Sequence, residues 1–341
     1  MSVKTPTDAP GGVSDPPEAP KSRLSLGKVR DLPHAGLIAV LVLVVVFTAV
    51  QSETFATDRN IVNILSQVSV NAVLAAGLTL LMTAGGMDFS MGSNVAVTAA
   101  VSARLLADGR PTGYAVVVAL VLGTVIGLVN GLVVTFTNVA PFVVTLASAT
   151  LLDGVALLVH DGSTISIGTR MFALGNDKVL GVPYLLIVAV LVLIVTALVM
   201  RFTVFGRDAF AIGGNEHVAR LSGINVTARK LTLYGLTGTL SGLAGLMLLS
   251  RLGSSSPGGT AGLSLQLAVV AAVVIGGTSL AGGHGTVIGT ALGLVLLGVV
   301  ANALNLLDFS SNYQPVSVGA VLLVAAVANE MHKARSGSAR H

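Results

Sequence analysis

One carboxylate, Asp88, lies in a part of the sequence that is otherwise almost free of charge. Asp88 lies between two long apolar runs, in the segment AGGMDFSMGSN at residues 84–94. A charged side chain inside a bilayer is costly unless it faces water or a partner, so Asp88 is a candidate for a translocation path. Alternatively, Asp88 or Ser90 satisfies the first amides of the following helix at a glycine-rich break near the surface. We favour the capping interpretation and keep the other open.

Uncharged amides form a second set of candidate residues. Asn130, Asn302 and Asn305 lie inside apolar runs that are long enough to be helices. Amides in such positions commonly form hydrogen bonds between helices. They also suit a polar conduit for a hydroxylated solute, and Asn302 and Asn305 share a helix face because they are three residues apart. The full set of candidate pathway residues is Asp88, Ser90, Asn94, Asn130, Thr278, Ser279, Asn302 and Asn305.

The longest polar stretch in the interior of the chain is GRDAFAIGGNEHVARLSGINVTARK, at residues 206–230. Asn215 is a good helix N-cap, Glu216 places negative charge in the first turn, and Gly223 is a natural stop. These residues predict a short helix of about two turns between two membrane spans. Five cations against two acids in residues 201–230 place it in the cytoplasm. It is either a docking surface for a partner or a solvated loop.

The sequence lacks the motifs of a self-sufficient enzyme. It has no cysteine, no phosphate-binding loop of the GxxxxGK type and no HExxH zinc motif. The glycine spacing of GGHGTVIG, which begins at Gly282, is not that of a dinucleotide fingerprint. His284, in the same segment, has no partner that would make a metal site. We therefore expect no catalytic residue, no metal site and no cofactor in this chain.

The composition indicates which elements must hold these residues. Of 341 residues, 53% are hydrophobic and 10% are charged, whereas a soluble domain has about 25% charged residues. Uncharged runs exceed the roughly 20 residues that span a bilayer, which predicts an all-α, polytopic membrane protein. The 40 glycines predict helices that pack closely through small residues. The net charge of +4 reflects cations in connecting segments, so we expect no nucleic-acid partner.

Hydropathy and turn signals predict about ten transmembrane helices, with both termini in the cytoplasm. The spans are expected at residues 32–52, 60–87, from 94 to about 103, two within 111–152, 179–200, 231–250, two within 252–307 around a turn at 276–285, and 316–329. Thirteen Lys and Arg residues then lie in the cytoplasm and six outside, in agreement with the positive-inside rule.

Three regions divide the chain. Residues 1–33 are expected to be a disordered cytoplasmic tail, 34–331 the transmembrane domain, and 332–341 a second cytoplasmic tail. Within the transmembrane domain, GGMDFSMG at residues 85–92 is echoed by GGTSLAGG at residues 276–283, which indicates two weakly related halves. Whether residues 87–94 are re-entrant is left open.

Four segments carry a resemblance to a known family. GGNEHVARLSGINV (213–226), AVVIGGTSLAGGHGTVIGT (272–290), AGGMDFSMGS (84–93) and APFVVTLAS (140–148) resemble the ribose-type sugar permeases of bacterial ABC importers. These permeases belong to a wider family that includes branched-chain amino acid permeases. The resemblance runs from about residue 35 to residue 330. His217, Val218, Phe89 and Met91 depart from the family pattern, and so does the proline-rich N-terminal tail.

The resemblance implies the membrane-spanning subunit of an importer in the bacterial cytoplasmic membrane. Such a subunit pairs with a second permease chain, docks on cytoplasmic ABC ATPase subunits that hold ATP and Mg, and receives a sugar from an extracytoplasmic binding protein. The coupling loop at 201–230 then carries a coupling helix. Its residues here are Gly213, Gly214, Asn215, Glu216, Arg220, Leu221, Ser222 and Gly223.

Other transport functions share these features. The same architecture could import a nucleoside or a branched-chain amino acid instead of a monosaccharide or polyol. A stand-alone secondary carrier would need an ion-coupling carboxylate, for which only Asp88 and Asp153 are available, and we expect Asp153 to be structural or close to a loop. A membrane enzyme would need a set of catalytic residues, and the sequence shows none. Homodimer and heterodimer are left open.

Overall fold

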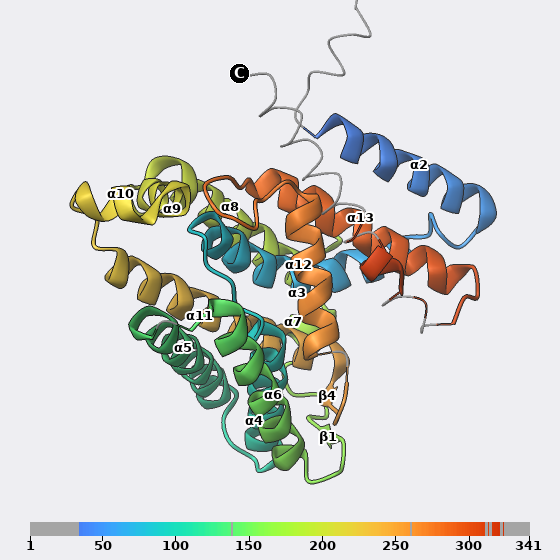
Figure 1. Cartoon of the computed structure of the whole chain (residues 1–341). Coiled ribbons are helices and arrows are strands. Elements are labelled where there is room, and N and C mark those ends of the chain that lie inside the picture. The colour runs from blue at the N-terminus through green and yellow to red at the C-terminus, as the bar shows by residue number, and fades with distance from the viewer. Residues whose placement is uncertain are drawn as a thin grey trace, which may run out of the picture.

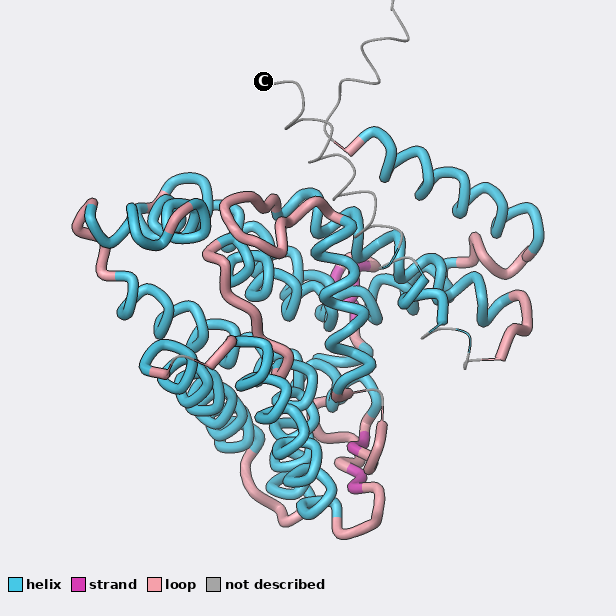
Figure 2. The backbone as a smooth tube through the Cα atoms, viewed as in Figure 1, coloured by secondary structure: helices cyan, strands magenta, loops and turns pink. Residues whose placement is uncertain are grey.

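Helices dominate the computed structural model, which describes residues 34–137, 139–259, 261–310, 313, 316–320 and 323 (Figures 1 and 2). The long apolar helices are α2 Ala35–Gln51, α3 Asp58–Thr83, α4 Met91–Ala107, α5 Thr112–Phe136, α6 Pro141–His160, α8 Tyr184–Phe202, α11 Val226–Leu252, α12 Leu263–Ile275 and α13 Val287–Leu306. Both expected tails, and most of the expected tenth span after residue 320, lie outside the described residues.

Six helices in the described part of the chain have the length and apolarity to cross a membrane: α3, α5, α6, α8, α11 and α13. The other three apolar helices are shorter, and α12 has only 13 residues where about 20 span a bilayer. The expectation that the uncharged run from 252 begins a full span is therefore not confirmed. Gly253 and Gly258, both at positive φ, hold the chain in a loop before α12.

The segment between α3 and α4 is the main irregularity among the spans. Helix α3 ends at Thr83, Gly85 adopts φ 75°, and the next helix begins only at Met91. The first turn of α4 then meets the start of α12, since the amide of Gly262 donates to the carbonyl of Gly92 over 2.9 Å. Two helices thus begin side by side inside the helical body, which is the form that transporters use for broken helices.

Glycines bring α5 and α11 into close contact, as the composition predicted. A Cβ atom on Gly127 would lie 2.9 Å from the Cα of Gly238, and one on Gly242 would lie 2.5 Å from the carbonyl oxygen of Ala119. Small residues at this spacing allow helix backbones to approach without side chains between them. Helix α11 consequently lies against α5 along much of its length and forms, with α3, the buried centre of the molecule.

The segment between the expected spans at 111–152 and 179–200 contains short elements of secondary structure. It contains the short helix α7 Phe172–Asn176 and the strands β1 Ile165–Ser166 and β2 Lys178–Val179. Strand β2 pairs with β3 Val182–Pro183, and β1 pairs antiparallel with β4 Ser254–Ser255. The β1–β4 pair ties the loop after α6 to the loop after α11, at the lower end of the molecule in Figure 1.

Candidate functional site

The polar stretch between α8 and α11 folds into two short helices at the upper left of Figure 1, remote from the β1–β4 pair. The second of them, α10 Glu216–Leu221, is the predicted short helix. The Asn215 side chain accepts the Val218 amide over 3.1 Å, and Gly223 has φ 83°, so both of its predicted ends are confirmed.

The first helix, α9 Val204–Gly214, was not predicted from the sequence. Its start carries a capping signal that could have been found, because the Thr203 hydroxyl accepts the Gly206 amide over 3.1 Å. Gly206 lies so close to the backbone of Met200 that α9 folds back sharply on α8. Helix α9 thus connects the last turn of α8 to α10.

Ion pairs hold α10 against the start of α11. Glu216 binds Arg220 over 2.7 Å within α10 and Lys230 of α11 over 2.6 Å, while Asp208 of α9 binds Arg229 over 2.7 Å. Burial raises the pKa of Glu216, but the hydrogen bonds and charges of Lys230 and Arg220 outweigh it, so the pKa lies below the ordinary value. Glu216 therefore stays ionised, and the three helices form one charged unit.

The outward face of α10 is apolar and uncovered. Val218 and Leu221 are 54% and 76% exposed and lie three residues apart, hence on one face, whereas Ala219 is buried beside Ile212. Exposed apolar side chains on a helix that charged residues fix in place are typical of a docking surface. This arrangement favours the docking interpretation of the stretch over a solvated loop.

Backbone atoms from three distant segments meet at the end of α9, at a site that we call the glycine junction: Thr83, Gly85, Gly213, Gly282 and Gly283. The Gly283 amide donates to the Thr83 carbonyl over 2.9 Å. A Cβ on Gly213 would overlap that carbonyl oxygen, and a Cβ on Gly282 would lie 2.8 Å from the Cα of Gly213 and 2.9 Å from that of Gly85. The two echoed glycine-rich segments thus meet each other and the helix that leads into α10.

Asp88 lies in a closed network of hydrogen bonds. Its Oδ1 accepts the Ser90 amide over 2.8 Å and the Ser90 hydroxyl over 2.6 Å, and the Asn130 amide donates to the Ser90 hydroxyl over 2.7 Å. All three residues are buried. Asp88 thus stabilises the turn before α4 rather than the first amides of that helix, which differs from a simple N-cap.

Two residues that sequence reasoning missed complete this network. Gln266 donates to the Asp88 carbonyl over 2.8 Å and accepts the Gly92 amide over 3.1 Å, and the Tyr234 hydroxyl donates to the Met87 carbonyl over 2.8 Å. Gln266 interrupts an uncharged apolar run just as Asn130 does, so the same rule would have found it. The network holds the break between α3 and α4 in place.

The remaining candidate pathway residues either lie apart from Asp88 or form hydrogen bonds with main-chain carbonyl groups. Asn94 donates to the Gly123 carbonyl of α5 over 3.2 Å. Thr278 is buried beside the glycine junction, and the Ser279 amide donates to the His284 carbonyl over 2.9 Å. Asn302 exchanges hydrogen bonds of 3.0 and 2.7 Å with Asn60 at the start of α3, and Asn305 lies one turn further along α13. The eight residues therefore do not converge on one site.

Comparison with known proteins identifies the family. The model of the family described as "Branched-chain amino acid transport system / permease component" matches residues 60–326. The chain belongs to this permease family. Among the described residues, no group of three His, Asp or Glu side chains is placed to hold a metal ion. With its apolar helices and this membership, the permease is a multi-pass membrane protein.

Curated relatives resemble the permease over nearly its whole length. The Ribose import permease protein of Haemophilus influenzae is 41% identical over 303 residues, which cover 87% of this chain and 93% of the relative. That of Bacillus subtilis is 42% identical, with 86% and 90% covered. The L-arabinose transport system permease protein of Escherichia coli is 34% identical, with 91% and 93% covered.

A solved structure shares the fold of the permease. It is described as an inward-facing conformation of a metal-chelate type ABC transporter, with a TM-score of 0.50 and 15% sequence identity, and the match covers 86% of this chain and 97% of that one. This likeness concerns the arrangement of helices alone.

Proposed function

We propose that the chain is the membrane-spanning permease subunit of an ATP-driven ABC importer, and that it forms the translocation pathway for a monosaccharide or related polyol. The single observation that carries the proposal is the exposed apolar face of α10, which ion pairs fix to α11 outside the long apolar helices. The names of the relatives, which are ribose and arabinose permeases, support a sugar as the substrate.

In this proposal the coupling residues are those predicted from the sequence, Gly213 to Glu216 and Arg220 to Gly223. A cytoplasmic ATPase subunit holds ATP and Mg and receives Val218 and Leu221 in a cleft. When the ATPase pair closes, it moves α10, and the glycine junction passes this motion to the ends of α3 and α12 because the backbones there touch without intervening side chains. The spans then alternate access to the pathway.

The other partners follow from the same assignment. A second permease chain, identical or related, lies beside the first across the pathway. A soluble binding protein delivers the sugar to the end that carries β1 and β4, while α10 lies in the cytoplasm. The membrane is the bacterial cytoplasmic membrane, and lipid covers the exposed apolar side chains of helices such as α5 and α8.

Co-purification tests the ATPase contact. The tagged permease, expressed in its native host and gently solubilised, should carry an ATPase subunit in stoichiometric amount. Leu221→Asp and Val218→Asp should remove the ATPase, because each places a charge on the apolar face that contacts it. Leu180→Asp is the matched control, since Leu180 is 99% exposed in the loop between β2 and β3. Retention of the ATPase by both α10 variants would refute the contact.

The family description favours one alternative, import of a branched-chain amino acid with the same architecture. Proteoliposomes that contain the purified complex separate the two. ATP-dependent uptake of D-ribose or L-arabinose, but not of L-leucine or adenosine, is expected. Uptake by the permease chain alone, without ATP, would instead indicate a secondary carrier.

A further inference from the structure

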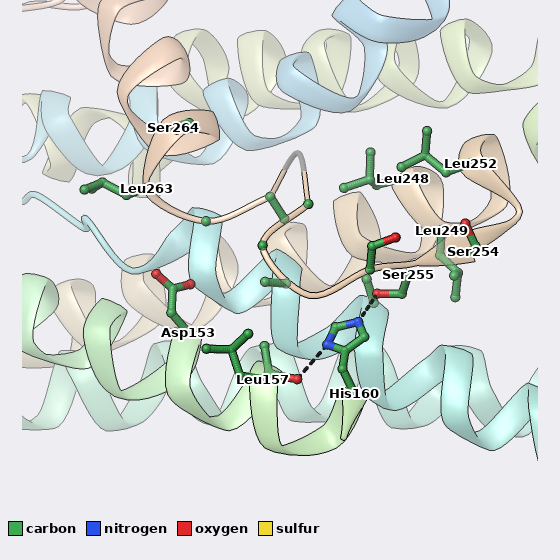
Figure 3. A pocket seen from close by; sticks show the side chains of 18 residues that line it. Asp153, Leu157, His160, Leu248, Leu249, Leu252, Ser254, Ser255, Leu263 and Ser264 are labelled. Atoms are coloured by element: carbon green, nitrogen blue, oxygen red, sulfur yellow. Dashed lines mark hydrogen bonds between the residues drawn. The ribbon is translucent and has the colours of Figure 1, made fainter. Parts of the chain in front are cut away.

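A cavity of about 410 Å³ lies between α6, the end of α11 and the loop that leads into α12 (Figure 3). Leucine and alanine side chains form most of its wall, and polar side chains reach it from both sides. These are Asp153, His160, Ser254, Ser255, Ser256 and Ser264. Asp153 and His160 both project from α6 toward the loop. The volume lies in the range of about 300–1,000 Å³ that small-molecule sites occupy.

Asp153 is a carboxylate that finds no partner among the residues that the structure describes. It lies on α6 seven residues before the last residue of that helix, and one oxygen comes within 3.2 Å of the position that a Cβ on Gly262 would take. Within the described part of the chain it forms no hydrogen bond and no ion pair. A carboxylate on an apolar helix is costly unless it faces water or a polar ligand, and the cavity provides the space for either.

The hydrogen bonds of His160 determine what Ser255 can offer. The Nδ1 atom lies 2.6 Å from the Ala156 carbonyl oxygen, which can only accept, so Nδ1 carries the proton. In the tautomer with the proton on Nδ1, Nε2 is the acceptor, and the Ser255 hydroxyl donates to it over 2.9 Å. Ser255 therefore presents only acceptor lone pairs to the cavity, and the Asp153 carboxylate oxygens can accept hydrogen bonds as well.

The wall thus offers fixed acceptors and no cation. Hydroxyl groups of a neutral solute can donate to Asp153 and Ser255, while the Ser256 and Ser264 hydroxyls can rotate to donate or to accept. A solute with its own carboxylate would instead meet Asp153 with no Lys or Arg in the lining to compensate. An amino acid could pair its ammonium group with Asp153, but its carboxylate would find no Lys or Arg in the lining, so the cavity suits a neutral polyol better.

We propose that the cavity formed by α6, the end of α11, residues 254–259 and the start of α12 binds a neutral polyhydroxylated solute, a monosaccharide or polyol, with Asp153 and Ser255 as the acceptors of its hydroxyl protons. This inference rests on the proposed sugar import and adds a binding site on the pathway. The site lies at the end of the molecule that carries β1 and β4, opposite α10, where a delivered sugar would enter.

Uptake kinetics test the role of Asp153. In proteoliposomes with the complete complex, Asp153→Asn should raise the KM for D-ribose by about tenfold or more, because it removes a charge-assisted hydrogen bond. Asp161→Asn is the matched control, since Asp161 lies just after α6 and does not line this cavity. The amount of ATPase that co-purifies must be unchanged in both variants, which shows that the complex has assembled.

Thiol protection tests the same site with Asp153 intact. The natural chain has no cysteine, so Ser256→Cys introduces a single thiol in the lining of the cavity. D-ribose should slow its reaction with a membrane-impermeant maleimide, and L-leucine should not. Ser166→Cys, exposed on β1 and outside the lining, should react at the same rate with and without D-ribose.

The outcomes separate the two proposals. Wild-type uptake of D-ribose or L-arabinose together with an unchanged KM in Asp153→Asn and no protection of Ser256→Cys would overturn the cavity site alone. Absence of ATP-dependent uptake of any hydroxylated solute by the wild-type complex would overturn the proposed function and this site with it. A raised KM and selective protection by D-ribose would support both.

Discussion

Asp88 illustrates how a buried carboxylate can serve structure. Asp88→Asn should leave stability and uptake nearly unchanged, because an asparagine oxygen can accept the same two hydrogen bonds from Ser90. Asp88→Ala should lower the free energy of unfolding by about 1–3 kcal/mol, the usual cost of leaving a buried donor without an acceptor. Thermal unfolding in detergent and ATP-dependent uptake measure the two effects.

Asp108→Asn is the control for Asp88, since Asp108 lies exposed at the end of α4. If Asp88→Asn abolished uptake while the protein remained as stable as the wild type, the negative charge itself would be required. Asp88 would then belong to the translocation pathway, as the first interpretation of the sequence held.

Glu216 forms two ion pairs, and the free energy that these pairs contribute determines how much its replacement changes stability. Exposed ion pairs contribute about 0.2–1 kcal/mol each, so Glu216→Lys should change overall stability little. It would, however, place a third cation beside Arg220 and Lys230 and push α10 away from α11. We therefore expect Glu216→Lys to lower the ratio of solute taken up to ATP hydrolysed, measured in proteoliposomes.

The neighbouring His217 provides the comparison for Glu216. His217→Lys adds a positive charge on α10 but leaves both ion pairs intact, because His217 takes part in neither. Equal ratios of uptake to hydrolysis in Glu216→Lys, His217→Lys and the wild type would count against α10 as the coupling element.

At this scale the sequence predicts local residues better than distant ones. Asn215 and Gly223 were recognisable because capping and positive φ depend only on adjacent backbone. The distant partners of the Met87–Asp88 segment were not, since Gln266, which donates to the Asp88 carbonyl, and Tyr234, which donates to the Met87 carbonyl, reach it only through the packing of α11 and α12. Asn302 was likewise recognisable as a buried amide, but its partner Asn60 was not.

At the scale of elements, the glycine junction connects α9 to the two glycine-rich segments. Gly213→Ala should impair uptake and weaken the docking of α9, because the new methyl group would overlap the carbonyl oxygen of Thr83. Gly214→Ala is the comparison on the same helix, because it changes the neighbouring coupling residue without a new overlap: a Cβ there meets no atom within 4 Å. A helical glycine replaced by alanine in open space is neutral or stabilising by up to about 1 kcal/mol.

Limited proteolysis within residues 201–230 and ATP-dependent uptake report on both glycine variants. Gly213→Ala should be cleaved faster than the wild type and Gly214→Ala should not. If the two variants behaved alike, the glycine junction would accommodate the methyl group of Gly213→Ala with little loss of stability. The junction would then not be the element that transmits motion from α10.

Two elements show the limit of prediction from hydropathy. Helix α9 was missed because residues 204–214 are short and mix apolar, charged and glycine residues, although the buried residues Gly206, Ala209 and Ile212 recur at helical spacing. Helix α12 was predicted too long because an uncharged run does not reveal where a glycine-rich loop ends inside it. The break after Thr83 was visible as a glycine pair, but its place beside α12 depends on the Gly92–Gly262 contact.

At the scale of the whole molecule, the helix ends form two groups. The starts of α2 and α13 are close, since the His34 ring lies 3.4 Å from the Thr286 hydroxyl, and Thr286 follows the turn that meets α9 at the glycine junction. At the other end, Arg251 donates to Asn63 near the start of α3 over 3.1 Å, and β1 pairs with β4. The predicted alternation of cytoplasmic and external loops assigns the first group to the cytoplasm and the second to the outside, and this assignment stays a prediction.

Cysteine labelling tests that orientation directly, because the natural chain has no cysteine to mask. Leu180→Cys, in the loop between β2 and β3, and Ser222→Cys, at the end of α10, are separated by one long apolar helix, α8. The distribution of cations predicts that Ser222 is cytoplasmic and that Leu180 is external. On spheroplasts, a membrane-impermeant maleimide should label Leu180→Cys and leave Ser222→Cys unmodified until the membrane is opened.

The pattern of labelling distinguishes the possible errors. Labelling of Ser222→Cys alone would invert the molecule and put α10 out of reach of a cytoplasmic ATPase. Labelling of both would mean that α8, despite its 19 apolar-rich residues, does not cross the bilayer. At one end α8 leads through α9 to α10, and at the other it follows the loop that contains β1, next to the proposed sugar cavity. Only if α8 crosses the bilayer can ATP binding in the cytoplasm move a part of the chain that continues to that external loop.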